Sequence, residues 1–213
     1  MAKTNQGILG AFTGTVGPIS AYLRNGQNII RPGTSNVNFT YTDPRVEQQQ
    51  KISICMRFIK VFSRTGFLKK SFPGYGSGAT GYNRAMSALM NQAVVGVYPD
   101  MQLSYPKVLV SQGRLPIAEN ASVVADEAGN IHFSFTDNSD TGTASGFDQV
   151  IVVAYAEALN QAVFSLNAGL RKNGKAVLNA ALFKGYAVET WIGFLSTDET
   201  NASDSVWTGR VEV

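Results

Sequence analysis

The feature that most constrains the fold is a change in hydrophobic periodicity near residue 106. Before it, apolar residues recur at spacings of three and four, which is typical of helices that bury one face. After it, apolar and polar residues alternate in short segments separated by turn residues, which is typical of β-strands. The predicted strands are 107–111, 121–125, 130–136, 149–157, 162–166, 175–180, 186–195 and 205–213.

Eight strands in about a hundred residues predict an all-β sandwich over 106–213. A sandwich needs about seven strands, so one of the eight is expected to be spurious. The corner at 182–188, with Leu182, Gly185 and Tyr186, resembles the turn before the sixth strand of fibronectin type III domains. The resemblance implies a sandwich of the immunoglobulin or fibronectin III type.

The first half of the chain is predicted to combine a short β-meander with two helices. Two or three strands are expected within 7–33, with Asn25-Gly26 forming a tight hairpin turn. Apolar residues at helical spacing predict one helix over 44–63 and a second over 82–95. A glycine- and proline-rich loop over 73–81 is expected to join the helices.

The two halves of the chain carry opposite net charge. Residues 1–105 contain 11 Lys and Arg against 3 Asp and Glu, whereas residues 106–213 contain 7 against 12. A division is therefore expected between a β-meander plus two-helix assembly region at 1–105 and the sandwich at 106–213. The asymmetry fits a nucleic-acid surface, head-to-tail contact between copies, or two differently solvated surfaces.

The apolar stripe of the first predicted helix is unusually broad. A stripe that wide indicates burial on more than one side, either by another element of the chain or by another chain. The residues that widen or complete it are candidate assembly contacts: Ile54, Phe58, Val61 and Phe62.

A basic cluster lies on and just after the same helix: Arg57, Lys60, Arg64, Lys69 and Lys70. Phenylalanines at 58, 62, 67 and 72 are interleaved with it. Basic and aromatic residues together are able to bind phosphates and stack on bases. The alternative is that the aromatics form core and the charges a solvated rim.

Candidate catalytic residues are few. His132 alternates with Ile131 and Phe133, which predicts an exposed position on a strand. Cys55 lies on the apolar face of the first helix and is expected to be a core thiol. The segment 76–81 has the spacing G-x-G-x-x-G, but no buried strand precedes it and no βαβ unit follows, so an interhelical loop is expected rather than a dinucleotide site.

No His or Cys pair has metal-ligand spacing, and no cofactor is predicted. Asp137, Asp140 and Asp148 flank a loop that offers oxygen atoms to Ca²⁺, although solvated turns between strands have the same composition. Trp191 and Trp207 are candidates for carbohydrate or protein binding by the sandwich, and Trp207 is equally a candidate packed strand aromatic.

Charged residues make up 15% of the chain and hydrophobic residues 44%, so a sizeable core is expected. No apolar run approaches the ~20 residues of a membrane span. The first residues are too polar for a signal-peptide core, so a cytoplasmic location, or one in a released particle, is expected. The single cysteine excludes an internal disulfide framework.

Several segments resemble a family of uncharacterised proteins from Bacteroidetes. They are 5–17 (NQGILGAFTGTVG), 43–50 (DPRVEQQQ), 82–87 (YNRAMS), Tyr98-Pro99 and 107–113 (KVLVSQG). The family is a domain of unknown function, so the resemblance implies neither a substrate nor catalytic residues.

The leading hypothesis is a non-enzymatic structural protein that self-assembles with other copies into a virion, tube, fibre or similar particle. It rests on the sparse catalytic set, the broad helix stripe, the opposite charges and strand edges that are free to pair. The alternatives are a nucleic-acid-binding module that uses the basic half, and carbohydrate or protein binding by the sandwich.

Overall fold

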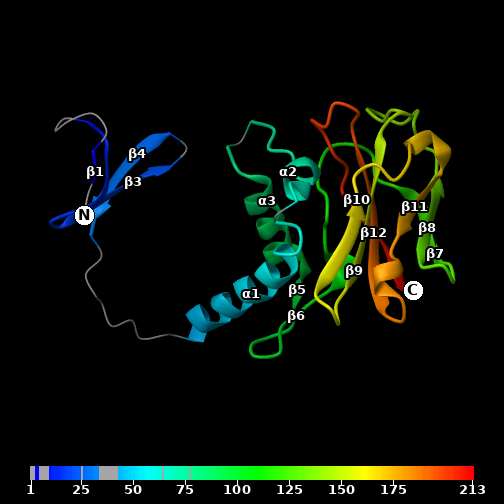
Figure 1. Cartoon of the computed structure of the whole chain (residues 1–213), viewed down its shortest axis with the longest axis horizontal. Helices are drawn as coiled ribbons and strands as arrows, with labels where there is room; N and C mark the ends of the chain where they lie inside the picture. Colours follow the sequence, from blue (N-terminus) through cyan, green and yellow to red (C-terminus); the bar gives the residue numbers. More distant parts are fainter. Residues whose placement is uncertain (1–2, 5–9, 25, 34–42, 64, 77) are drawn as a thin grey trace. The chain divides into compact units, whose positions relative to one another are not determined.

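The chain forms two compact units, residues 1–42 and 43–213. The structure is a computed structural model, and it describes residues 3–4, 10–24, 26–33, 43–63, 65–76 and 78–213. The first unit is a β-meander in which each strand pairs antiparallel with the next (Figure 1). Its strands are β1 (Lys3–Thr4), β2 (Phe12–Val16), β3 (Ile19–Arg24) and β4 (Gln27–Pro32). The predicted hairpin between β3 and β4 is confirmed, although Asn25 of its turn lies outside the described residues.

The second unit contains the predicted β-sandwich. One sheet has four strands in the order β10-β9-β12-β13, and the other has three in the order β11-β8-β7. The strands are β7 (Glu119–Ala125), β8 (Asn130–Thr136), β9 (Gln149–Ala156), β10 (Gln161–Ser165), β11 (Lys175–Asn179), β12 (Ala187–Leu195) and β13 (Val206–Glu212). Seven of the eight predicted strands are therefore confirmed, and with them the all-β sandwich.

The spurious strand is the one predicted over 107–111. Its first residue, Lys107, is the last of a 3-10 turn (Tyr105–Lys107), and the rest of the segment forms no β-ladder. The N–H of Val110 donates to Ser205 Oγ at 2.9 Å, and the N–H of Ser205 donates to the Ser111 carbonyl at 3.0 Å. The segment lies against β12 because Gly193 has no side chain there: a Cβ atom would stand 2.5 Å from Ser111 Oγ.

The corner at 182–188 departs from the fibronectin pattern that it resembles. Leu182 is 70% exposed and Tyr186 is 40% exposed, so neither anchors the turn. Phe183 is fully buried there instead, and Gly185 has a φ of +83°, which favours glycine. A phenylalanine thus supplies the apolar anchor that was expected from the leucine and tyrosine.

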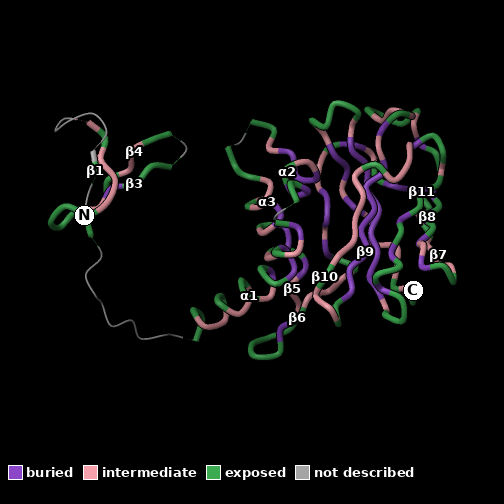
Figure 2. Tube along the Cα trace, in the orientation of Figure 1, coloured by how far each residue is buried: buried purple, intermediate pink, exposed green. Residues whose placement is uncertain are grey.

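The four-stranded sheet is covered on both faces (Figures 1 and 2). Val152, Ala154 and Ile192 belong to the core between the two sheets. Their neighbours Val153 and Trp191 belong to a second core beneath the helices. Strands buried on both faces are apolar almost throughout, as β9 and β12 are.

The helices form a third layer on the outer face of this sheet (Figure 1). They are α1 (Asp43–Ile59), α2 (Phe67–Ser71) and α3 (Gly81–Ala88), and a π-helical turn (Leu89–Ala93) extends α3. The Thr80 hydroxyl accepts from the N–H of Asn83 at 3.3 Å and caps α3. A short two-stranded ladder follows, β5 (Val94–Val95) with β6 (Gln102–Leu103).

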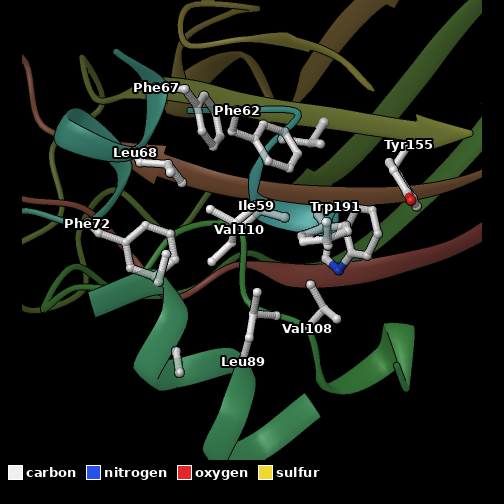
Figure 3. Packing of buried hydrophobic residues seen from close by; sticks show 14 of the residues in the cluster. Ile59, Phe62, Phe67, Leu68, Phe72, Leu89, Val108, Val110, Tyr155 and Trp191 are labelled. Atoms are coloured by element: carbon white, nitrogen blue, oxygen red, sulfur yellow. The ribbon is translucent and has the colours of Figure 1, made fainter. Parts of the chain in front are cut away.

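The helical layer and the sandwich therefore share a core (Figure 3). Phe58 packs edge-on against Tyr155 of β9 and Trp191 of β12, with ring centroids 5.0 and 6.0 Å apart. Consequently the chain divides between residues 42 and 43, not near residue 105 as predicted. Within the part of the chain that the structure describes, none of the helices has the length and apolarity to cross a membrane.

Candidate functional site

The candidate assembly contacts on α1 and just after it belong mainly to the core of the chain. Phe58 is 2% exposed and Phe62 is 1% exposed, so the prediction that they contact another chain is wrong. The broad stripe is buried by another element of the same chain, namely the four-stranded sheet. Ile54 and Val61 are half-buried, and Val61 packs against the same core.

The basic residues near α1 do not converge on one surface with the aromatics. Arg57, Lys60 and Lys69 are exposed, whereas Lys70 pairs with Glu199 at 2.7 Å. Arg64 lies outside the described residues. The interleaved phenylalanines at 58, 62, 67 and 72 are all buried, so they are core and do not stack on bases.

The segment 76–80 is part of the loop that joins α2 to α3, as predicted, and Gly81 is the first residue of α3; Ser77 is not described. Tyr75 at its start has a φ of +45°. Two guanidinium groups lie near its ring, that of Arg114 at 4.5 Å and that of Arg84 at 5.2 Å from the centroid, and its hydroxyl donates to Asn201 Oδ1. These contacts hold the loop against the β12–β13 connection.

Cys55 is a core thiol, as predicted. It is fully buried, and burial raises its pKa to about 11. The nucleophilic form of cysteine is the thiolate, so a thiol with this pKa is protonated and inert at neutral pH.

His132 is exposed on β8, as predicted, and it contacts the β7–β8 turn. Its Nε2 lies 3.0 Å from Asp126 Oδ2. Asp126 Oδ1 also accepts the N–H of Asn130 at 2.7 Å. The hydrogen bond to His132, with those to Asn130, holds the pKa of Asp126 well below its ordinary value of 3.8.

The lowered pKa of Asp126 predicts that this residue makes a pH-dependent contribution to the stability of the fold. A carboxyl group whose pKa is lower in the folded state stabilises the fold above its unfolded pKa, and the contribution is lost as the pH falls through the folded value. Asp126→Asn is therefore expected to lower the denaturation midpoint at pH 7, with the difference narrowing below pH 3.8. Urea titrations at several pH values test this. The control is Glu127→Gln, and a pH-independent difference for Asp126→Asn would contradict it.

In the acidic loop before β9, Asp148 forms a buried ion pair with Arg171. Arg171 is fully buried, and its Nε lies 3.1 Å from Asp148 Oδ2. Its Nη1 donates to Asn138 Oδ1 at 2.6 Å and its Nη2 to the Pro116 carbonyl at 3.2 Å. Asp148 thus faces inward and does not join Asp137 and Asp140. Among the described residues, no three Asp, Glu, His or Cys side chains gather as metal ligands.

The two tryptophans do not form a binding platform. Trp191 is fully buried in the core shared by the helices and the sheet, so its predicted role in carbohydrate or protein binding is wrong. Trp207 is half-buried on β13, and its Nε1 donates to Glu189 Oε2 at 2.8 Å. Trp207 is thus a packed strand aromatic, the other interpretation of the sequence.

The meander remains as the candidate site, because most of its apolar side chains lie on one face and its charged side chains lie on the other. Side chains of residues paired across neighbouring strands project to the same face of a sheet. The register pairs Gly14 and Ile30 with Ala21, Val16 with Ile19, and Asn28 with Leu23. We call the face thus formed the apolar face; its apolar side chains are Phe12, Val16, Ile19, Ala21, Leu23 and Ile30.

The apolar face is mostly uncovered among the described residues of its own unit. Ala21 is the buried residue of this group. Val16 is 51% exposed, and Leu23 and Ile30 are each 55% exposed. The described residues of this unit thus form one sheet, without the second layer around which domains are normally built.

The opposite face of the meander carries its cationic side chains, together with the paired residues Tyr22 and Ile29. Strand alternation and the pairing of Lys3 with Thr13 place Lys3, Arg24 and Arg31 on this face. The Arg31 guanidinium lies 5.5 Å from the centroid of the Tyr22 ring. Since residues 1–42 contain no Asp or Glu, the meander is amphipathic, with its charge of one sign and on one face.

The sequence contained a signal for this face that the helix-centred prediction missed. Apolar residues recur at every second position over 19–23 (Ile19, Ala21 and Leu23), which predicts one shared face for this strand although Tyr22 is also aromatic. The same sequence signals that β9 is buried on both sides, because residues 150–156 form a continuous apolar run.

Comparisons with known proteins give a family and two distant structural likenesses. No curated protein matches the chain. The crystal structure of the chicken CNTN1 FN1-FN3 domains is 10% identical with a TM-score of 0.33, covering 48% of this chain and 33% of that one. The chain thus spans a third of that structure's length. The fn3 domain of human collagen alpha-1(XX) chain is 14% identical with a TM-score of 0.32, and the match covers 48% of this chain and 88% of that domain.

The family match covers nearly the whole sequence. Residues 11–209 match the Family of unknown function (DUF6266), which includes most of the meander, the helical layer and nearly all of the sandwich. The predicted resemblance to a family of unknown function is confirmed. The chain belongs to this family.

Proposed function

We propose that the protein is a non-enzymatic structural protein that self-assembles through the apolar face of its meander. The observation that carries the proposal is the exposure of Val16, Leu23 and Ile30 on one face of a single-layer sheet. Burying apolar surface contributes roughly 25 cal/mol per Å², so a face of this kind gains stability when it is covered. The partner in this proposal is a second copy of the chain.

A second copy fits this face for two reasons. Sheets pack face to face at about 10 Å when both present apolar side chains, and two identical apolar faces meet this condition. The charges at Lys3, Arg24 and Arg31 lie on the other face, so they do not oppose each other across the contact. Two meanders packed in this way form the two-layer sheet that one meander lacks.

The proposal predicts that a charge on the apolar face prevents assembly. Ile30→Glu is expected to weaken association by at least about 30-fold, because burying an unpaired carboxylate costs roughly 2 kcal/mol or more. Gln27→Glu is the matched control, because it places the same group on the opposite face of β4. Light scattering during size-exclusion chromatography gives the molar mass of the particle that each protein forms in solution.

The native chain and Gln27→Glu are expected to elute above the 22.9 kDa of one chain, and Ile30→Glu at that mass. Equal masses for the two variants would contradict the proposal. The second unit serves as an internal check on folding, because it has its own cores and contains neither substitution.

The form of the particle stays a prediction: a virion component, a tube, a fibre or a similar assembly. The Bacteroidetes origin suggested by the sequence motifs likewise stays a prediction. Nucleic-acid binding by the basic residues is a weaker alternative, because the aromatics expected to stack on bases are buried. Retention on heparin that falls steeply with salt would favour it.

A further inference from the structure

A pocket in the second unit has no part in the proposed assembly. It has a volume of about 500 Å³ and opens between α1, the segment 101–106 and the end of β9. Cavities of roughly 300–1,000 Å³ commonly hold small ligands. Ile54, Phe58, Met101 and Tyr155 contribute its apolar and aromatic walls.

Two opposite charges line this pocket from different elements. Arg57 comes from α1, and Glu157 follows β9. Both side chains act electrostatically on Tyr155, which lies in the same pocket. Among the described residues, they nevertheless form no ion pair within 4.0 Å, either with each other or with any other group.

Tyr105 holds the acidic side of the pocket. It lines the pocket together with Glu157, and its ring centroid lies 6.1 Å from that of Tyr155. Burial, together with the nearby Glu157 carboxylate, raises the pKa of Tyr105 far above its ordinary range. The hydroxyl therefore stays protonated at neutral pH, so Tyr105 adds no negative charge to the acidic side of the pocket.

The second tyrosine is held in a different way. The Tyr155 hydroxyl donates to Asn160 Oδ1 at 3.0 Å, and its ring packs edge-on against Phe58 at 5.0 Å. The aromatic wall is thus fixed by contacts of its own. Arg57 and Glu157 retain hydrogen-bonding capacity that these contacts do not use.

We propose that this pocket binds an apolar α-amino acid as its zwitterion. A guanidinium binds a carboxylate through parallel hydrogen bonds, which assigns the ligand carboxylate to Arg57. The Glu157 carboxylate accepts the ligand ammonium, and the walls formed by Phe58, Tyr155 and Ile54 receive the apolar side chain. The charges of the pocket and of a zwitterion thus match one to one.

Isothermal titration of the full chain with L-phenylalanine tests the proposal. Two analogues each lack one charge: phenethylamine has no carboxylate, and 3-phenylpropanoate has no ammonium. L-Phenylalanine is expected to bind at least about tenfold more tightly than either, because each analogue loses one of the two charge-assisted contacts. Failure of L-phenylalanine and L-leucine to bind, or equal binding of an analogue, would overturn the proposal.

Matched variants distinguish the effect of removing a charge in the pocket from the effect of removing a charge elsewhere on the surface. Arg57→Gln and Glu157→Gln are each expected to weaken L-phenylalanine binding at least about tenfold, because each removes one charged partner of the ligand. Lys60→Gln and Glu127→Gln are the controls, since both residues are exposed and neither lines the pocket. Similar losses in the controls would overturn the assignment. The assembly variant Ile30→Glu is expected to bind normally.

Discussion

Replacing Arg171 with methionine is expected to lower the free energy of unfolding by about 3–5 kcal/mol, because it leaves a buried carboxylate without its partner. Asp148 is 2% exposed, and once the guanidinium is gone the Ser145 N–H, at 3.0 Å, is the remaining donor to its Oδ2. Asn138 and the Pro116 carbonyl lose donors as well. Urea denaturation followed by tryptophan fluorescence measures the loss.

The neighbouring residue supplies the control. Lys172 is exposed, with its ammonium 4.3 Å from the centroid of the Phe147 ring, so Lys172→Met is expected to cost less than about 1 kcal/mol. The double variant Arg171→Met with Asp148→Asn is expected to be more stable than Arg171→Met alone, because it leaves no unpaired buried charge. A loss below about 1 kcal/mol for Arg171→Met would contradict the role of the ion pair.

Trp191→Ala is expected to cost a similar amount, about 3–5 kcal/mol, through the cavity that it leaves. Trp191 is fully buried where the helices meet the sheet, with its ring centroid 6.0 Å from that of Phe58 and 6.2 Å from that of Tyr105. Unfolding of this variant, followed by two different signals, tests whether the helices and the sandwich unfold together. Circular dichroism at a helical wavelength and Trp207 fluorescence are expected to report one transition at the same urea concentration.

Trp191→Phe is the conservative control for this position. Among the residues that the structure describes, the indole N–H of Trp191 has no hydrogen-bond partner, so removing it offsets part of the lost packing. We expect Trp191→Phe to cost less than half of what Trp191→Ala costs. Separate transitions for the helical and fluorescence signals would contradict the shared core and would favour the division near residue 105.

The strands of the sandwich were predictable because each carries a local signal. Seven segments with alternating or continuous apolar residues and polar turns became β7 to β13, most of them within one or two residues of the prediction. The failed strand at 107–111 has the same local pattern. It lacks a ladder because Val110 and Ser111 bond to the Ser205 residue of a distant segment, and no local pattern encodes that contact.

The candidate site was harder to predict because burial depends on contacts that are distant in sequence. The stripe containing Phe58 and Phe62 indicated a partner, but whether that partner was another chain or the sheet of the same chain was not encoded locally. The partner is the four-stranded sheet of the same chain, because the side chains of β9 and β12 are buried on both faces of that sheet. Once the helices cover it, the exposed apolar surface of the meander becomes the candidate for contact between chains.

The most direct test of the assembly proposal measures whether the apolar face is covered in solution. Leu23→Cys and Arg24→Cys place a thiol on opposite faces of β3, and the native Cys55 is fully buried with a raised pKa. Maleimide labelling is then followed from dilute to concentrated protein. We predict that labelling of Leu23→Cys slows at least about tenfold as the protein is concentrated, while that of Arg24→Cys does not change. Equal and concentration-independent labelling at both positions would contradict the account.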